Sequence, residues 1–96
     1  MAGPVVEKEM SISHADFLRL LPRALGTEDF SLEGNRIRLD RPGRRLEITL
    51  GPEGERRIAR LTLPVTRVRL VFSGYGAEEA RAALCRFDRA YQRGGG

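Results

Sequence analysis

The sequence RIRLDRPGRRLEITL, from Arg36 to Leu50, decides the fold. Aliphatic residues occupy alternate positions on both sides of Pro42-Gly43, and charged residues and threonine fill most of the positions between them. A period of two is typical of strands with one buried face, and proline followed by glycine fits the centre of a type II turn. The stretch predicts an antiparallel hairpin whose inward residues are Ile37, Leu39, Leu46, Ile48 and Leu50.

Two further strands are predicted after this hairpin. Gly51-Pro52-Glu53-Gly54 interrupts the alternation, which resumes over residues 58–63 until Pro64 ends it. A fourth strand runs from about Thr66 to Phe72. Connections this short favour antiparallel neighbours, because a parallel return needs a crossover of about a dozen residues or more. The inward residues of these two strands are Ala59, Leu61, Leu63, Val68, Leu70 and Phe72.

A helix is predicted before the strands, from about His14 to Leu25. Ser13 and Asp16 form a capping box, in which the serine hydroxyl accepts from the backbone three residues on. Gly26 provides a stop. Pro22 lies inside the helix and predicts a kink or a break, because it removes one backbone donor.

A second helix is predicted after the strands, from Ala77 to about Gln92. Glu78 and Glu79 lie in its first turn, where the helix dipole favours negative charge. Its apolar stripe consists of Ala80, Leu84, Phe87 and Tyr91.

These elements define an α+β fold of order α-β-β-β-β-α. A four-stranded antiparallel meander carries the N-terminal and the C-terminal helix on one face, so that the opposite face is exposed. A small, partly closed barrel flanked by the helices is the alternative. We expect residues 1–12 to be a loose lead-in, residues 13–93 to form a single domain, and residues 94–96 to be a flexible glycine tail.

Composition limits the class of protein. The chain has 96 residues with a formal net charge of +4, and one cysteine excludes an internal disulfide framework. Neither a secretory signal nor an apolar run long enough to span a membrane is present in the sequence. We therefore expect a cytoplasmic protein.

The predicted strands carry most of the positive charge. From Gly34 to Phe72 there are ten arginines and four acidic residues. The strand phases place only Asp40 and Glu47 beside the arginines of the exposed face. Those arginines are Arg36, Arg38, Arg45, Arg60, Arg67 and Arg69. Such a face attracts an acidic protein surface or nucleic acid phosphates. It lacks the aromatic residues on which bases stack, which favours a protein partner and leaves nucleic acid as the alternative.

Catalytic chemistry has little support in the sequence. His14 is the only histidine and Cys85 the only cysteine, which is too few for a typical zinc site. The two form a nucleophile pair only if the helices bring them face to face. We expect no enzymatic activity, no metal and no cofactor.

The C-terminal sequence supplies a separate hypothesis. Arg93-Gly94-Gly95-Gly96 resembles the end of ubiquitin-like modifiers and sulfur carriers, whose terminal Gly-Gly is adenylated and then conjugated or thiocarboxylated. The resemblance covers four residues and implies a carrier role for Gly94, Gly95 and Gly96. Those families place a helix between strand pairs, whereas the strands predicted here are consecutive.

The sequence as a whole predicts a small non-enzymatic binding or adaptor module. Its partner-binding residues are the outer arginines, and its favoured partner is an acidic protein. Whether the chain is a monomer or a homodimer joined through a sheet edge stays open.

Overall fold

The hairpin predicted at residues 36–50 forms as β3 (Arg36–Arg41) and β4 (Arg44–Leu50) in the computed structural model, which describes residues 2–94. The strands are antiparallel, with Ile37 opposite Ile48. Gly43 has a φ of 77°, as the third position of a type II turn requires. The fold class is α+β, with six antiparallel strands and two helices.

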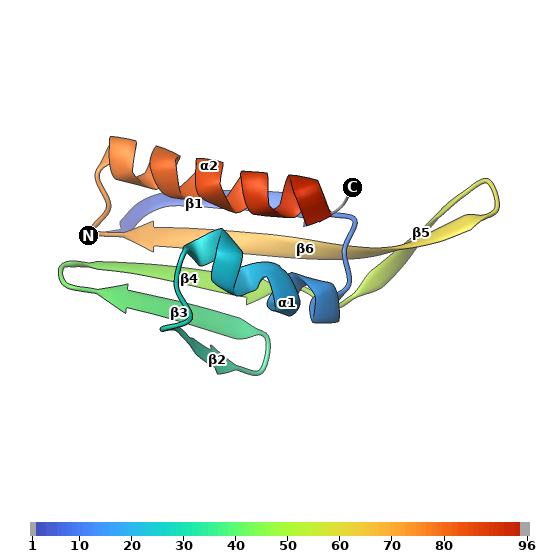
Figure 1. Ribbon diagram of the computed structural model, residues 1–96, viewed down its shortest axis with the longest axis horizontal. Coiled ribbons are helices and arrows are strands. Elements are labelled where there is room, and N and C mark those ends of the chain that lie inside the picture. Colours follow the sequence, from blue (N-terminus) through green and yellow to red (C-terminus); the bar gives the residue numbers. More distant parts are fainter. Residues whose placement is uncertain (1, 95–96) are drawn as a thin grey trace.

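The longest strand is β6 (Leu61–Ser73), which pairs with three of the other five strands. The sheet order is β1-β6-β4-β3-β2, with β1 (Ala2–Met10) and β2 (Ser31–Glu33) at the two ends of that path. A sixth strand, β5 (Gly54–Ile58), pairs with the first part of β6 and projects with it beyond the body of the protein (Figure 1). The sheet is open, so the barrel alternative is wrong.

The first correction concerns residues 1–12, where a loose lead-in was expected. Ala2–Met10 forms β1, which pairs antiparallel with β6. Val6 and Met10 pack against the core, whereas Glu7 and Glu9 lie opposite Arg69 and Arg67 on the exposed side. Charged residues are common on edge strands because they discourage pairing with other chains. They also weaken the apolar alternation by which a strand is recognised.

The second correction concerns the expected third strand. Ala59 and Arg60 form the turn between β5 and β6, with Ala59 at a positive φ of 55°. Pro64 lies within β6 opposite Glu55, instead of ending a strand. At this point β6 has β5 as its only neighbour, because pairing with β1 begins at Thr66. A strand with one unpaired side tolerates proline, because the missing backbone donor can face that side. The four-stranded meander is therefore wrong, and β4 pairs directly with β6.

The first helix forms as predicted. The helix α1 (His14–Leu25) is capped by Ser13, whose hydroxyl accepts from the backbone of Asp16 at 3.1 Å. It ends at Gly26, which has a φ of 73°. The helix continues through Pro22, so the alternative of two separate pieces is wrong.

The second helix, α2 (Ala77–Gly94), extends two residues past its predicted end. Gly94 therefore belongs to α2 and not to a flexible tail, whereas Gly95 and Gly96 lie outside the described residues. Tyr91 and Phe87 both lie on the buried side of this helix, as its predicted stripe requires.

Both helices pack into one hydrophobic core with the inward side of the sheet. Phe17 of α1 stacks on Tyr91 of α2, with ring centroids 4.9 Å apart, and Phe87 contacts both rings. The buried hydroxyl of Tyr91 donates to the carbonyl of Phe17 at 2.8 Å, which joins the helices by a hydrogen bond. Burial raises the pKa of Tyr91 above its ordinary value.

The link between β6 and α2 lies against the β3–β4 turn. Gly74 has a φ of 78°, and a Cβ atom built there would lie 2.1 Å from the carbonyl oxygen of Gly43. Only glycine permits this approach, because any larger residue combines a strained backbone with a collision.

We predict that the protein loses stability above about pH 10, the ordinary pKa of tyrosine. The unfolded chain ionises Tyr91 there while the folded protein keeps it neutral, so the free energy of unfolding falls by up to about 1.4 kcal/mol per pH unit. Urea unfolding followed by far-UV circular dichroism between pH 7 and 11 measures this slope. In Tyr91→Phe the slope is reduced, and an unchanged slope would contradict the assignment.

We predict that Gly74→Ala destabilises the protein more than Gly34→Ala. Both glycines have positive φ, which costs an alanine roughly 1 kcal/mol, but Gly34 has no atom within 4 Å of its added Cβ. The difference in the free energy of unfolding therefore isolates the collision with Gly43. Equal losses in the two variants would show that the link does not lie against the turn.

Candidate functional site

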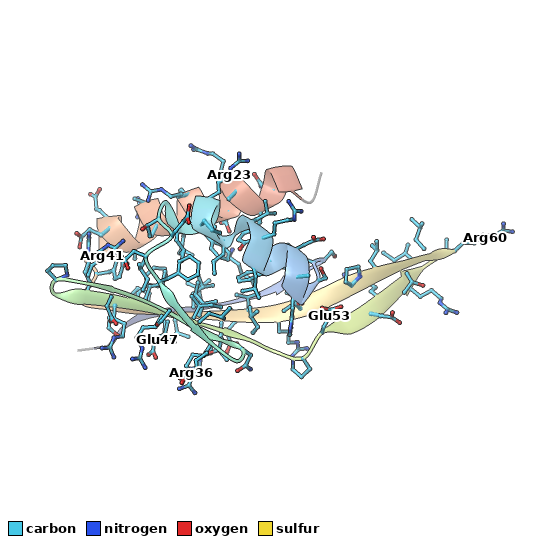
Figure 2. All side chains as sticks on the ribbon, turned by 60° about the horizontal axis from the view of Figure 1, so that its bottom comes forward. Arg23, Arg36, Arg41, Glu47, Glu53 and Arg60 are labelled. Atoms are coloured by element: carbon cyan, nitrogen blue, oxygen red, sulfur yellow. The ribbon has the colours of Figure 1, made fainter. Side chains whose placement is uncertain are left out.

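The predicted partner-binding arginines do not form a single patch. Five of them, Arg36, Arg38, Arg45, Arg67 and Arg69, lie on the outer sheet face, the side opposite the helices. Figure 2 shows Arg36 and Glu47 on that side and Arg60 far away, at the tip of the β5–β6 hairpin. The prediction for Arg60 is wrong in placement, because this residue belongs to a turn and not to a strand.

The outer sheet face carries as many acidic residues as arginines. The strand alternation in the sequence predicted only Asp40 and Glu47 on this face. The edge strands β1 and β2 add three more acidic residues, which are Glu7, Glu9 and Glu33. Glu33 lies opposite Arg36. Opposite charges across strands stabilise a sheet modestly and cancel each other's field at a distance. The expected positive face is therefore wrong, and the formal charges of its five acids and five arginines balance.

Most of these arginines also have a carboxylate close by. The Nε atom of Arg45 lies 2.6 Å from Asp40, and this hydrogen bond raises the pKa of Arg45 above its ordinary value. Carboxylate oxygens lie within 3.9 Å of the guanidinium nitrogens of the other three paired arginines, Arg38, Arg67 and Arg69. A partner that binds these arginines has to displace an existing ion pair.

A different surface is exposed on the projecting hairpin, residues 54–65, which we call the arm. Ile58 lies opposite Leu61 at its tip, with 51% and 64% of their surfaces exposed. Leu63 and Val65 continue the same face, because strand positions two apart point to the same side. The arm therefore presents an apolar strip that Ile58, Leu61, Leu63 and Val65 form.

Arginines lie on both faces of the arm. Arg56, opposite Leu63, shares the face of the strip, whereas Arg57, opposite Thr62, points to the other face. Arg56, Arg57 and Arg60 lie on the arm and are exposed, and no acidic residue occurs between residues 56 and 63. Arg56 forms an ion pair with Glu9 of β1, which ties the base of the arm to the sheet. Arg57 and Arg60 make no ion pair within residues 2–94. An apolar strip with arginines beside it is the composition typical of a protein interface.

Sequence reasoning missed the arm for a specific reason. The turn dipeptide Ala59-Arg60 lacks the glycine or asparagine that usually marks a two-residue hairpin turn. The signal that remained in the sequence was an aliphatic residue on each side of that dipeptide, Ile58 and Leu61.

The chain's histidine and cysteine are not brought together. His14 donates from Nε2 to the carbonyl of Gly51 at 2.7 Å, and so anchors the start of α1 to the end of β4. Cys85 is exposed on α2, in a groove with Arg23 and Arg89. Within residues 2–94, no group of three or more His, Cys, Asp or Glu side chains is placed to hold a metal ion.

Comparisons with protein-family models, with curated proteins and with solved structures found no match for this chain. No helix in the described part of the chain is long and apolar enough to cross a membrane.

We predict that the arm opens far more readily than the centre of the sheet. Two strands without a covering layer are marginally stable, whereas Val68, Leu70 and Phe72 of β6 are almost fully buried. Amide hydrogen exchange followed by NMR measures this, with low protection expected over residues 55–63 and global protection over residues 68–72. Equal protection along β6 would mean that the arm is held by contacts other than its own pairing.

Proposed function

We propose that this protein is a non-enzymatic binding module whose arm docks on an acidic protein surface that contains an apolar groove. The observation that carries the proposal is the apolar strip of Ile58, Leu61, Leu63 and Val65, which is exposed at its tip at the end of an otherwise well-packed fold. Arg57 and Arg60 lie near that tip and have no ion-pair partner within residues 2–94. In this mechanism the strip supplies most of the binding free energy. Arg57 and Arg60 supply steering and bidentate contacts to carboxylates.

Two features favour the arm over the outer sheet face as the docking surface. The outer face is balanced in charge and four of its five arginines form ion pairs, whereas Arg57 and Arg60 are exposed and have no carboxylate partner among the described residues. The arm also stands away from the body, in a molecule whose principal extents are 47 × 25 × 22 Å (Figure 1). A projecting ribbon can enter a groove that a flat sheet cannot.

A protein is favoured over nucleic acid by the chemistry of the arm. No aromatic residue occurs between residues 54 and 65, so the arm offers no surface for base stacking. Against a phosphate backbone, the apolar strip would contribute little to the binding free energy. We keep the cytoplasm as the proposed compartment, because a single cysteine suits a reducing environment.

We predict that Ile58→Ser combined with Leu61→Ser abolishes partner capture without loss of the fold. Removing two exposed aliphatic side chains from the centre of an interface costs roughly 2 kcal/mol or more in binding. Immobilised wild-type and variant proteins are compared for the proteins they retain from a nuclease-treated extract. A retained protein is then purified and its affinity measured by calorimetry.

The matched control is Leu32→Ser combined with Arg36→Gln, because Leu32 is similarly exposed at 48% but lies on β2. A true arm partner is retained by this control, is lost by the arm variant, and binds Arg57→Gln/Arg60→Gln about tenfold more weakly. Loss of all capture after nuclease treatment would instead identify nucleic acid. Sedimentation that depends on concentration in the wild type but not in the arm variant would identify a second copy of this chain as the partner. Either result overturns the proposal.

A further inference from the structure

A cavity of about 370 Å³ lies on the helix side of the sheet, between the end of α1, the first half of α2 and the β3–β4 turn. This volume falls in the range of small-molecule sites. Its inner wall is apolar and its outer part is cationic. The apolar wall includes Leu39, Leu46, Phe72, Ala83 and Phe87.

Two arginines occupy core-facing positions at one end of this cavity. Arg41 is two residues after the buried Leu39, and Arg44 is two residues before the buried Leu46, so both follow the inward phase. They lie directly opposite each other across the two strands. Figure 2 shows Arg41 on the side of the sheet that carries the helices. Like charges in directly opposite positions destabilise a hairpin, so placing two arginines there lowers the stability of the folded protein.

The carboxylates of this chain only partly offset that charge. Glu79 of α2 lies 2.5 Å from Arg44, and Asp29 lies 3.6 Å from Arg41 but is itself 90% exposed. The guanidinium of Arg44 also lies 5.2 Å from the ring centroid of Tyr75, a contact that fixes its position. Arg44 is therefore well oriented at the rim, and Arg41 keeps a solvated and displaceable partner.

A third arginine reaches the rim from α2. Arg86 lies against Gly26 at the end of α1, with Nη1 3.5 Å from the carbonyl of Leu25. It forms no ion pair among residues 2–94. The rim thus has three guanidinium groups and one lining carboxylate, that of Glu79.

We propose that this cavity binds a small organic monocarboxylate with an apolar body. The carboxylate lies among Arg41, Arg44 and Arg86, where planar guanidinium groups can form bidentate hydrogen bonds. The apolar body lies against the inner wall, at Leu39 and Ala83. This ligand supplies a carboxylate to Arg86, which has no ion-pair partner among residues 2–94, and competes with the exposed Asp29 for Arg41. Its apolar body fills the space behind them. The proposal is independent of the arm.

The probe is octanoate, below the concentration at which it forms micelles, titrated by calorimetry and by NMR. We expect it to bind about tenfold more tightly than 1-octanol, which lacks the charge, and than acetate, which lacks the apolar body. Amide shift changes are expected at Thr27, Tyr75 and Ala83 and not in the arm. Shift changes confined to the arm, or equal binding of octanoate and 1-octanol, would overturn the proposal.

Three variants locate the site. Arg86→Gln and Arg41→Gln each weaken octanoate binding about tenfold, because each removes one charged donor. Ala83→Phe fills the cavity and abolishes binding, while Arg81→Gln, on the same helix but outside the cavity lining, leaves the affinity unchanged. Thermal unfolding checks that each variant is folded. An equal loss in Arg81→Gln would reduce the effect to general charge attraction, and unchanged binding in both Arg86→Gln and Arg41→Gln would place the ligand elsewhere. Either result overturns the site.

Discussion

Burial of one side of β6 is the constraint on which the arrangement of the other strands depends. Val68, Leu70 and Phe72 are no more than 1% exposed, so the register of every neighbour is set by the need to cover them. β1 and β4 flank this part of the strand, and both helices pack over it. Thr66, also fully buried, donates to the carbonyl of Ile12 and so joins the strand to the start of the helical layer.

The same strand explains why the two sides of the sheet differ in character. From Val68 to Phe72 its inward residues are apolar. At that end of the sheet the neighbouring strands place Arg41 and Arg44 in the same phase. Its outward residues, Arg67 and Arg69, meet the acidic residues of β1. Positive charge is therefore neutralised on the flat face and left less compensated at the edges of the molecule, on the arm and around the cavity. A count of charges along the sequence cannot distinguish these two outcomes.

Local chemistry determined which parts could be predicted from sequence. The caps of α1 and the β3–β4 turn depend on residues within a few positions of each other, and both formed as expected. β1 could not be predicted because its pairing partner is some sixty residues away in the sequence. The arm was hidden by its Ala59-Arg60 turn, and the cavity by Arg41 and Arg44, which in the sequence are the flanks of a turn. Five of the six predicted arginines lie on one face, but the acids that balance them come from edge strands.

The free outer side of β5 has a consequence for the behaviour of the protein in concentrated solution. An unpaired edge with aliphatic residues at its tip is a template on which other chains can add strands and aggregate. Charged residues next to such segments act as gatekeepers, because repulsion between like charges keeps two edges apart. Arg56, Arg57 and Arg60 occupy those positions. The colloidal solubility of the chain therefore depends on the same guanidinium groups that border the apolar strip, which limits how far this segment can change in evolution.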